Sequence, residues 1–410
     1  MIVLYKLMVS GQTMLIQLSY FRIPFSRLLF ACLLLQPVIA PAANTEADPG
    51  WLRQVLEQYS ESYNMPAIGV SVVIGGEVVA ASVIGRRKSD ENIPAQQNDR
   101  FHIGSIAKPM TVTMLARLVE LGFFNWNDTI EKMFPGLVDI MQPTYRKVTI
   151  EQLISHTSGM PYSPVTPETE TDKYGSTLES KRKGYVIAAL KDPPLANPGT
   201  KYIYGGGHII AAHYAEILMG ITYEDLMKQE VFDPLGMQSA RFGTTATPGK
   251  VDAPWEHIME NGMLKPVPPD NRQYHQARSP VGRNLCMSVS DLGRFAAIHL
   301  VGANKSNRFL KKETFTYLHG PVTEVAAGPS WSIGKVDWAK GRILWHGGSN
   351  LRNLAKCHIV PDENFAVCLA TNVWYEGIDE PFDRLNLEIV QMIQAGKFNS
   401  LLTSRSNEPD

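Results

Sequence analysis

Strand patterns lie near both ends of this chain, and that placement constrains the fold more than any other feature. Two β-branched runs, Ala67–Ile74 and Glu77–Val83, are joined by two glycines, which is a hairpin signal. Four further strand patterns lie near the C-terminal end, while the middle of the chain is rich in helical patterns. This order predicts an α/β (α+β) fold: one antiparallel sheet built from both ends and flanked by helices, with a mostly helical lobe inserted at about residues 110–285.

The helical patterns and loops fit one domain over residues 43–398. Segments 161–180 and 244–278 are rich in Pro, Thr, Asp and Glu, and are predicted to be surface loops. The polar tail, residues 399–410, is predicted to be loose and flexible. The predicted helices are Trp51–Tyr63, Ser105 to about Leu121, Ser290–Leu300 and Asp379–Ala395, and the later strands are Trp331–Val336, Ile343–His346, Leu354–Val360 and Phe365–Thr371.

Residues 1–42 have the pattern of an export signal. Three basic residues are followed by the apolar run Leu28–Ala40 and then by small residues up to Ala43. A basic flank, a short apolar segment and small residues at its end are typical of a secretory signal peptide. We predict cleavage after Ala42 or Ala43 and a secreted or periplasmic protein. The alternative is an uncleaved segment that anchors the protein in a membrane.

The charge balance argues against a nucleic-acid partner. The chain has 39 Lys and Arg against 40 Asp and Glu, a formal net charge of -1, and no dense basic run. Binding to nucleic acid requires a basic patch or stripe, which this pattern does not supply. The sequence also lacks the Cys and His spacings of a zinc site, so neither a metal nor a cofactor is expected.

Cysteines are few for an exported protein. Three remain after the predicted cleavage, Cys286, Cys357 and Cys368, so the fold does not depend on a disulfide framework. Cys357 and Cys368 flank a predicted turn and would face each other across neighbouring strands if that turn closes a hairpin. They would then form a strained cross-strand disulfide or remain as buried thiols. We favour thiols, because directly paired strand positions fit disulfide geometry poorly.

Ser105 and Lys108 are the first candidates for catalysis. Three positions apart at the start of a helix, they project from the same face, and the serine oxygen lies near free backbone N–H groups. A partly desolvated lysine at that place loses its proton more easily and can serve as a base. The same spacing occurs at Ser180–Lys183 and Ser332–Lys335, but only Ser105 follows a strand-like segment and precedes an apolar helix. Taken alone, Ser105 is equally well explained as a helix cap.

The second candidate is segment 198–208, in which Tyr202 and Tyr204 precede a run of three glycines. Glycines allow the backbone to approach a ligand closely. A tyrosine beside a cationic lysine can have a lowered phenol pKa and act as a base. The alternative is structural: the tyrosines pack in the core and the glycines make a tight turn.

The third candidate is His346-Gly347-Gly348-Ser349, at the end of a strand. The paired glycines let a substrate run close to the strand edge. The backbone N–H of Ser349 could complete an oxyanion hole with the N–H of Ser105. Read alone, a histidine before two glycines is also a common turn feature.

Taken together, these segments resemble the motifs of the serine β-lactamase and penicillin-binding-protein superfamily in order and approximate spacing. The resemblance is closest to its class C-like branch, which also contains DD-peptidases, D-aminopeptidases and esterases that use S-x-x-K. It extends from about Ala67 to about Asn372. Leu153–Met160 is similar to the family's L-L-x-H-T-S-G segment, and Ser279–Gly282 with the following helix is similar to its loop and helix before the last strands.

The resemblance implies a role for each motif residue. Ser105 would be the nucleophile that forms the acyl-enzyme, and Lys108 the base, or the group that keeps the base anionic. Tyr204 matches the Tyr of the family's Y-x-N, which moves protons between the serine and the leaving group. Tyr202 would then be a packing aromatic.

Two residues depart from the family pattern. Gly206 stands in place of the Asn of Y-x-N, and His346 stands in place of the Lys of K-T-G, with Gly347 and Gly348 completing that element. The three glycines would contact the substrate. The family's Asn holds an amide carbonyl of the acyl group, so its loss argues against efficient β-lactam hydrolysis, and Gly206→Asn is expected to raise it. Histidine carries less positive charge than lysine, so recognition of a substrate carboxylate should be weaker.

These departures favour a serine hydrolase that acts through an acyl-enzyme on esters, small amides or D-amino-acid peptides. One alternative is a β-lactam hydrolase of class C type. The other is a catalytically inactive sensor or binding protein that is similar to penicillin-binding proteins, for which Gly206 is the main support. The expected partner is a small-molecule or peptide substrate, with no membrane partner beyond the export signal, and the oligomeric state is left open.

Overall fold

The computed structural model describes residues 3–9, 12–18, 46–162, 173–270, 284–304, 308–321, 328–329 and 331–405. The chain divides into two units, residues 1–38 and 39–410. In the first unit, β1 (Val3–Val9) and β2 (Gln12–Leu18) form an antiparallel hairpin. The apolar run of the predicted signal peptide lies outside the described residues, so the signal peptide remains a prediction.

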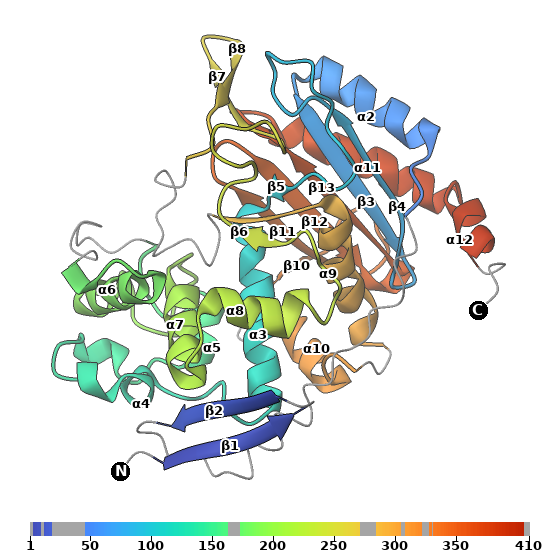
Figure 1. Cartoon of the computed structure of the whole chain (residues 1–410). Helices are drawn as coiled ribbons and strands as arrows, with labels where there is room; N and C mark the ends of the chain where they lie inside the picture. Colours follow the sequence, from blue (N-terminus) through green and yellow to red (C-terminus); the bar gives the residue numbers. More distant parts are fainter. Residues whose placement is uncertain are drawn as a thin grey trace. The chain divides into compact units, whose positions relative to one another are not determined.

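A six-stranded antiparallel sheet forms the centre of the second unit (Figure 1). Its N-terminal hairpin consists of β3 (Ala67–Ile74) and β4 (Glu77–Gly85), and β3 pairs with β13 (Phe365–Thr371) from the other end of the chain, as the sequence predicts. The hairpin turns at Gly75 and Gly76, whose φ angles of 67° and 97° favour glycine. The N–H of Ala67 donates a 2.7 Å hydrogen bond to Asn372 Oδ1, which ties the start of the first strand to the end of the last. In spatial order the strands are β10 (Ser332–Gly334), β11 (Ile343–Ser349), β12 (Leu354–Val360), β13 (Phe365–Thr371), β3 (Ala67–Ile74) and β4 (Glu77–Gly85).

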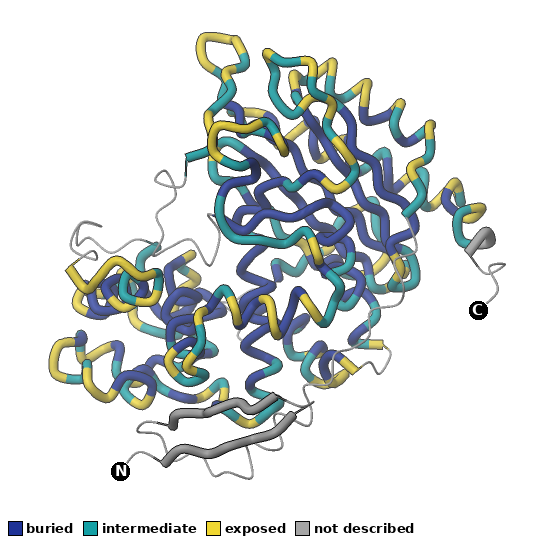
Figure 2. The backbone as a smooth tube through the Cα atoms, viewed as in Figure 1, coloured by how far each residue is buried: buried dark blue, intermediate teal, exposed yellow. Residues whose placement is uncertain are grey.

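Helices cover both faces of this sheet. The central strands β12 and β13 are buried along their whole length, as Figure 2 shows, and β13 is accordingly an almost continuous apolar run. One core lies between the sheet and the terminal helices, and a larger core lies between the opposite face and the middle of the chain. The helices of the first core are α2 (Gly50–Ser62), α11 (Asp379–Gln394) and α12 (Asn399–Arg405), and the second face carries α9 (Val289–Gly302), with α10 (Lys312–Leu318) beside it.

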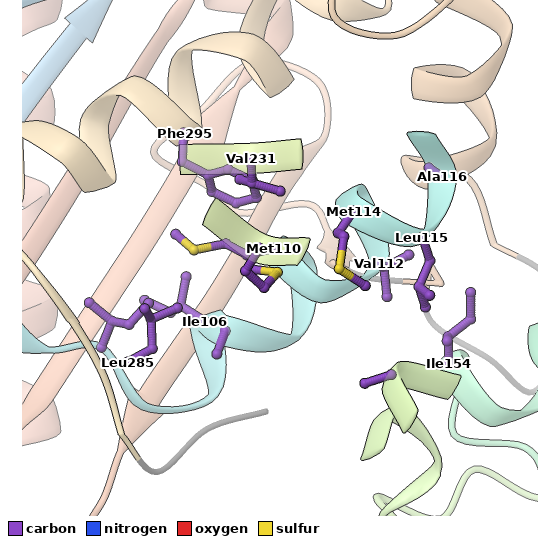
Figure 3. Packing of buried hydrophobic residues seen from close by; sticks show 14 of the residues in the cluster. Ile106, Met110, Val112, Met114, Leu115, Ala116, Ile154, Val231, Leu285 and Phe295 are labelled. Carbon is purple, nitrogen blue, oxygen red and sulfur yellow. The ribbon is translucent and has the colours of Figure 1, made fainter. Parts of the chain in front are cut away.

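The middle of the chain forms a helical region around α3 (Ala107–Glu120). This helix is buried over most of its length, and Met110, Val231 and Phe295 pack together from three different elements (Figure 3). The mostly helical lobe predicted from the sequence is therefore present. Its other elements are α4 (Ile130–Met133), η2 (Pro135–Leu137), η3 (Pro143–Tyr145), α5 (Ile150–Ile154), α6 (Leu178–Lys191), α7 (Gly207–Met219), α8 (Tyr223–Met227) and the π-helical turn η5 (Lys228–Phe232).

The helical region ends earlier than residue 285, which corrects one predicted boundary. After Phe232 the chain forms short strands, including a hairpin inside the segment predicted to be a loop. That hairpin turns at Asn261-Gly262, with φ angles of 51° and 75°. Asn-Gly is a hairpin signal, but the polar composition of the segment favoured the prediction of a loop. Two three-stranded sheets result, one of β5 (Phe101–His102), β9 (Leu285–Met287) and β6 (Arg241–Phe242), the other of β14 (Val373–Trp374), β7 (Glu256–Glu260) and β8 (Met263–Val267).

The prediction of a loose tail from residue 399 is wrong over its first part. Residues Asn399–Arg405 form α12, and Leu401 and Leu402 pack against the core beside the sheet. These two leucines supply the apolar surface by which α12 packs against the neighbouring core. Residues 406–410 lie outside the described part.

The cysteine prediction is confirmed. Cys357 in β12 and Cys368 in β13 are register partners, joined by the short turn η8 (Pro361–Glu363). Both are buried free thiols, with Sγ atoms 3.3 Å apart. Separately, among the helices that the structure describes, none is long and apolar enough to cross a membrane.

Candidate active site

Ser105 lies where a short strand turns into the buried helix α3. The chain passes from β5 through the 3-10 turn η1 (Gly104–Ile106) into that helix. Ser105 is the one residue of 101–110 that is not buried. Gly104 has a φ of 53°, and a Cβ there would lie 2.3 Å from the backbone nitrogen of Ser349. The glycine therefore allows the turn that presents the serine hydroxyl next to the end of β11.

Lys108 reaches back from the first turn of α3 to the serine. Its Nζ atom is 3.1 Å from Ser105 Oγ, and the residue is only 2% exposed. The same Nζ lies 4.7 Å from the ring centre of Tyr204 and 5.8 Å from that of Tyr162. A buried amine in contact with a hydroxyl and two aromatic faces matches the predicted pairing of Ser105 and Lys108 on one face of a helix.

Tyr204 is held beside them by His156, a residue to which the sequence assigned no role. The backbone N–H of Ile203 donates to the carbonyl of His156 over 2.8 Å, and the N–H of Gly205 donates to His156 Nδ1 over 3.1 Å. The two rings are 4.4 Å apart between centroids. His156 adopts a left-handed φ of 60° to make these contacts. The available signal was its place inside segment 153–160, which carries part of the family resemblance.

The pKa of Tyr204 moves in the direction opposite to the one expected. Burial raises it to about 12, while hydrogen bonding with the Ser105 side chain acts to lower it. A lysine beside the phenol predicts a lowered pKa instead. Burial has a larger effect than the hydrogen bond with Ser105, so Tyr204 is a protonated phenol at neutral pH and is suited to donate a proton rather than to accept one.

The strand end at residues 346–349 lies directly against Ser105. A Cβ on Gly348 would be 2.6 Å from the Ser105 backbone nitrogen and 2.0 Å from the Ile103 carbonyl oxygen. Gly347 has open space, because its nearest neighbour would be 4.0 Å away. The N–H groups of Ser105 and Ser349 thus belong to two backbone segments in direct contact, the arrangement that a shared oxyanion hole requires.

His346 is a neutral imidazole in this setting. Burial and the nearby Lys108 lower its pKa to about 4. Its Nδ1 lies 2.7 Å from the carbonyl of Gly347, so Nδ1 carries the hydrogen and donates. The expectation that this position supplies less positive charge than the family's lysine agrees with these contacts.

A small cavity of about 20 Å³, enough for one water molecule, opens beside Lys108. Trp331 and Pro329 line it although no motif points to them, and so does His208, the last residue of the candidate segment 198–208. Tyr202, expected to be a packing aromatic, is 46% exposed, and its ring meets that of His156 in a T-shaped arrangement with centroids 5.4 Å apart. The lining residues are Lys108, Ile154, His156, Tyr202, His208, Gly328, Pro329, Trp331, Ser332 and His346.

The space beside Gly206 is filled by another side chain. A Cβ on Gly206 would lie 1.9 Å from the hydroxyl oxygen of Tyr185, a residue on α6 that is 1% exposed. An asparagine therefore does not fit at position 206 while Tyr185 is present. This corrects the expectation that Gly206→Asn by itself raises β-lactam turnover.

Comparison with known proteins agrees with this fold. The curated penicillin-binding protein 4 of Amycolatopsis lactamdurans is 24% identical over 330 residues, which cover 76% of this chain and 81% of that protein. The lovastatin esterase of Penicillium rubens is 26% identical over 183 residues, 41% of this chain and 46% of the esterase.

Among solved structures, EstCE1, described as a hydrolase with promiscuous acyltransferase activity, superimposes with a TM-score of 0.67 at 16% identity. The match covers 83% of this chain and 96% of EstCE1, and it shows a shared fold. The family model described as Beta-lactamase matches residues 52–391, which include every motif residue discussed above. This chain therefore belongs to the Beta-lactamase family and is a serine hydrolase.

Proposed function

We propose that the protein hydrolyses carboxylic esters or small amides through an acyl-enzyme on Ser105. The observation that carries this proposal is the 3.1 Å contact between Lys108 Nζ and Ser105 Oγ in a buried position. An amine within hydrogen-bonding distance of a hydroxyl is the arrangement of a base and its nucleophile. D-amino-acid peptides are the second substrate class, because they present the same carbonyl to the same groups.

Acylation follows from this geometry. Ser105 Oγ forms a bond to the substrate carbonyl carbon while its proton passes to Lys108, acting as a neutral amine. The carbonyl oxygen becomes an oxyanion, which the N–H groups of Ser105 and Ser349 would hold. The bond to the leaving alcohol then breaks. The leaving oxygen takes a proton from the Tyr204 hydroxyl, and the Lys108 ammonium returns a proton to Tyr204.

In deacylation a water molecule replaces the alcohol, and Lys108 again accepts a proton and returns it. A water molecule attacks the acyl carbon and gives one proton to Lys108. When the tetrahedral intermediate collapses, the bond to Ser105 Oγ breaks and the lysine returns that proton to the serine. The acid is released and the free enzyme is restored.

The surroundings of the site favour neutral substrates over β-lactams. His346 is uncharged at neutral pH, so it provides no cation for a substrate carboxylate. Tyr185 occupies the space beside Gly206, so no amide side chain can hold an acyl amide there. The cavity wall mixes Tyr202, Trp331 and Pro329 with Lys108 and buried histidines. The name lovastatin esterase among the similar proteins supports an ester substrate.

Activity assays on a panel of substrates test this proposal. Purified protein is given p-nitrophenyl esters, D-Ala-D-Ala peptides and a cephalosporin, and is labelled with fluorophosphonate and fluorescent penicillin probes. We expect ester turnover and labelling that Ser105→Ala reduces by about 10⁴-fold or more. Ser180→Ala is the matched control, because Ser180 belongs to the second S-x-x-K pattern and lies half-buried in the first turn of α6. An unreactive native protein would instead support a non-catalytic binding or sensor protein, and fast cephalosporin turnover a β-lactam hydrolase.

We also propose that the protein is exported and acts outside the cytoplasm. The basic flank, apolar run and small residues over 1–42 support this location. Mass spectrometry of the protein recovered from its native host is expected to show an N-terminus at Ala43 or Asn44. Recovery of the intact chain in the membrane fraction would indicate the anchored alternative.

A further inference from the structure

Tyr185 is a buried tyrosine that neither the motifs nor the proposed mechanism uses. It lies on α6, and its hydroxyl donates a 3.1 Å hydrogen bond to the carbonyl oxygen of Tyr162. The same hydroxyl oxygen would be 1.9 Å from a Cβ at position 206, and its ring carbon Cζ would be 3.0 Å away. Tyr185 therefore occupies the volume that a side chain at position 206 would require.

The hydrogen bond of Tyr185 acts on a residue that faces the catalytic groups. The ring of Tyr162 stacks on that of Tyr204, with centroids 5.7 Å apart and planes inclined by 16°. Tyr162 also lies 5.8 Å from Lys108 Nζ. A second hydrogen bond, from the N–H of Gly206 to the carbonyl of Pro161 over 3.1 Å, holds the preceding residue. Segment 161–162 is thus fixed between Tyr185 and Gly206.

We propose that Tyr185 is a positioning residue, which through the Tyr162 carbonyl seats the Tyr162 ring against Tyr204 and Lys108. Glycine at position 206 is then the partner of Tyr185 rather than a simple loss of the family's asparagine. Residues 185 and 206 act together. The Tyr185 hydroxyl fills the space beside Gly206, and the same hydroxyl aligns the Tyr162 ring with the catalytic groups. This inference rests on the proposed hydrolase function, because its measurements use ester turnover.

Tyr185→Phe removes only the hydroxyl and is the first test. We expect kcat/KM for a p-nitrophenyl ester to fall between about tenfold and a hundredfold, mainly through kcat, because the reacting groups are displaced. The pH profile of kcat/KM should also move, since aromatic faces next to Lys108 stabilise its charged form and their distance changes. A purely structural role would leave that profile in place.

Tyr375→Phe is the matched control. The Tyr375 hydroxyl also donates to the backbone carbonyl of a tyrosine, Tyr63, over 2.6 Å, but it belongs to the core on the far side of the sheet. This variant loses the same type of hydrogen bond and should keep the kinetics and pH profile of the native enzyme. If Tyr185→Phe behaves like Tyr375→Phe while Ser105→Ala is inactive, the positioning role is wrong and the proposed function stands.

A double-mutant cycle with Gly206→Ala tests the pairing of the two positions. Alone, Gly206→Ala forces a methyl group against the Tyr185 hydroxyl and should lower both kcat/KM and the melting temperature. In the Tyr185→Phe background the contact with the hydroxyl is gone and the ring carbon Cζ, 3.0 Å from the Cβ, remains, so the added loss should shrink by at least about threefold, a non-additive result expected of residues in contact. Equal losses in both backgrounds would overturn the pairing. Residual turnover in Ser105→Ala would overturn the proposed function and, with it, the inference.

Discussion

Gly348 packs so closely against Ser105 that a Cβ on the glycine would lie 2.6 Å from the serine's backbone nitrogen. The contact joins the last residues of β11 to the turn that starts α3, two segments that are far apart in the sequence. Because both partners are backbone atoms, neither can move aside as a flexible side chain would. The spacing of the two N–H groups that would hold the oxyanion is therefore set by the absence of a side chain at this position.

Replacing Gly348 by alanine should separate these segments. We expect Gly348→Ala to lose roughly 1–3 kcal/mol of unfolding free energy through overpacking, and most of its ester turnover. Gly334→Ala in β10 is the control, because its Cβ would meet nothing within 4 Å and Gly334 is not among the residues that line the cavity. Urea unfolding and esterase assays on both variants make the comparison. Similar behaviour of the two glycines would show that the close contact does not govern the site.

Tyr204→Phe should lower kcat by about 10²- to 10⁴-fold, the usual contribution of general acid–base catalysis. Since burial raises the pKa of Tyr204 to about 12, the phenol stays protonated over the range in which the enzyme can be assayed. Tyr204 should therefore cause no decline of kcat/KM below about pH 10. Any decline in that range should be the same in the native enzyme and in Tyr204→Phe. Tyr202→Phe, which alters the neighbouring exposed tyrosine, should change turnover little. A basic limb near pH 8 that vanishes with Tyr204 would contradict the assignment of this residue as a proton donor.

His156 should tolerate asparagine better than alanine. Asparagine can place an acceptor near the position of Nδ1 and is among the residues that adopt a left-handed φ most readily. His156→Asn is expected to keep the hydrogen bond from Gly205 and to retain activity within about tenfold, whereas His156→Ala should lose more, because Tyr204 is released. Measuring kcat and KM separately for both variants distinguishes the two. Equal losses would mean that the hydrogen bond does not position the tyrosine.

The stability of the protein should fall steeply below neutral pH. In the part of the chain that the structure describes, seven histidines have lowered pKa values, principally because burial disfavours their charged form: His156, His208, His257, His299, His319, His346 and His358. In the unfolded chain these groups take up protons below about pH 6.5, whereas in the folded chain they resist protonation, and His257, His346 and His358 stay neutral to about pH 4. Their contribution to stability is complete above pH 6.5 and is lost as the pH falls toward 4.

Urea unfolding at pH 7 and pH 5 measures this effect. For His257, whose pKa falls from 6.5 to about 4, the expected loss between the two pH values is about 2 kcal/mol. His257→Gln keeps an acceptor for the 3.1 Å hydrogen bond from the N–H of Ser89 but does not titrate, so its pH dependence should be smaller by that amount. If the unfolding free energy of His257→Gln depends on pH as strongly as that of the native protein, His257 does not contribute to the pH dependence.

Much of the architecture could be read from the sequence because it depends on local patterns. The hairpin at Gly75-Gly76, the long apolar strands and the amphipathic terminal helices each fix their own secondary structure, and long elements suffer little from neighbouring influences. The errors lie in short elements. The strands β7 and β8 and the final helix α12 are short or polar, and a few contacts with the rest of the fold decide whether they form.

The site was predictable in part for a similar reason. Ser105 and Lys108 are three residues apart on one helix, so local geometry alone brings them together. Their meeting with Tyr204 and with the end of β11 required the order of the motifs, and the structure places all of these groups around Ser105. Tyr162, Tyr185 and Trp331 could not be found, because no spacing relates them to the serine, and for His156 the family-like segment 153–160 was the one signal.

The sequence by itself determined which residue types this site can use and which helix carries its serine and lysine, since these follow from covalent order and helical period. Only the tertiary structure decided how each group behaves there. The pKa of Tyr204 rises rather than falls because burial removes water from the phenol, and this raises the pKa by more than the hydrogen bond with Ser105 lowers it. The glycine at position 206 is required rather than merely tolerated because the ring of Tyr185, from a distant helix, already occupies its space. Both outcomes depend on what surrounds a residue in three dimensions, and the linear sequence does not specify those neighbours.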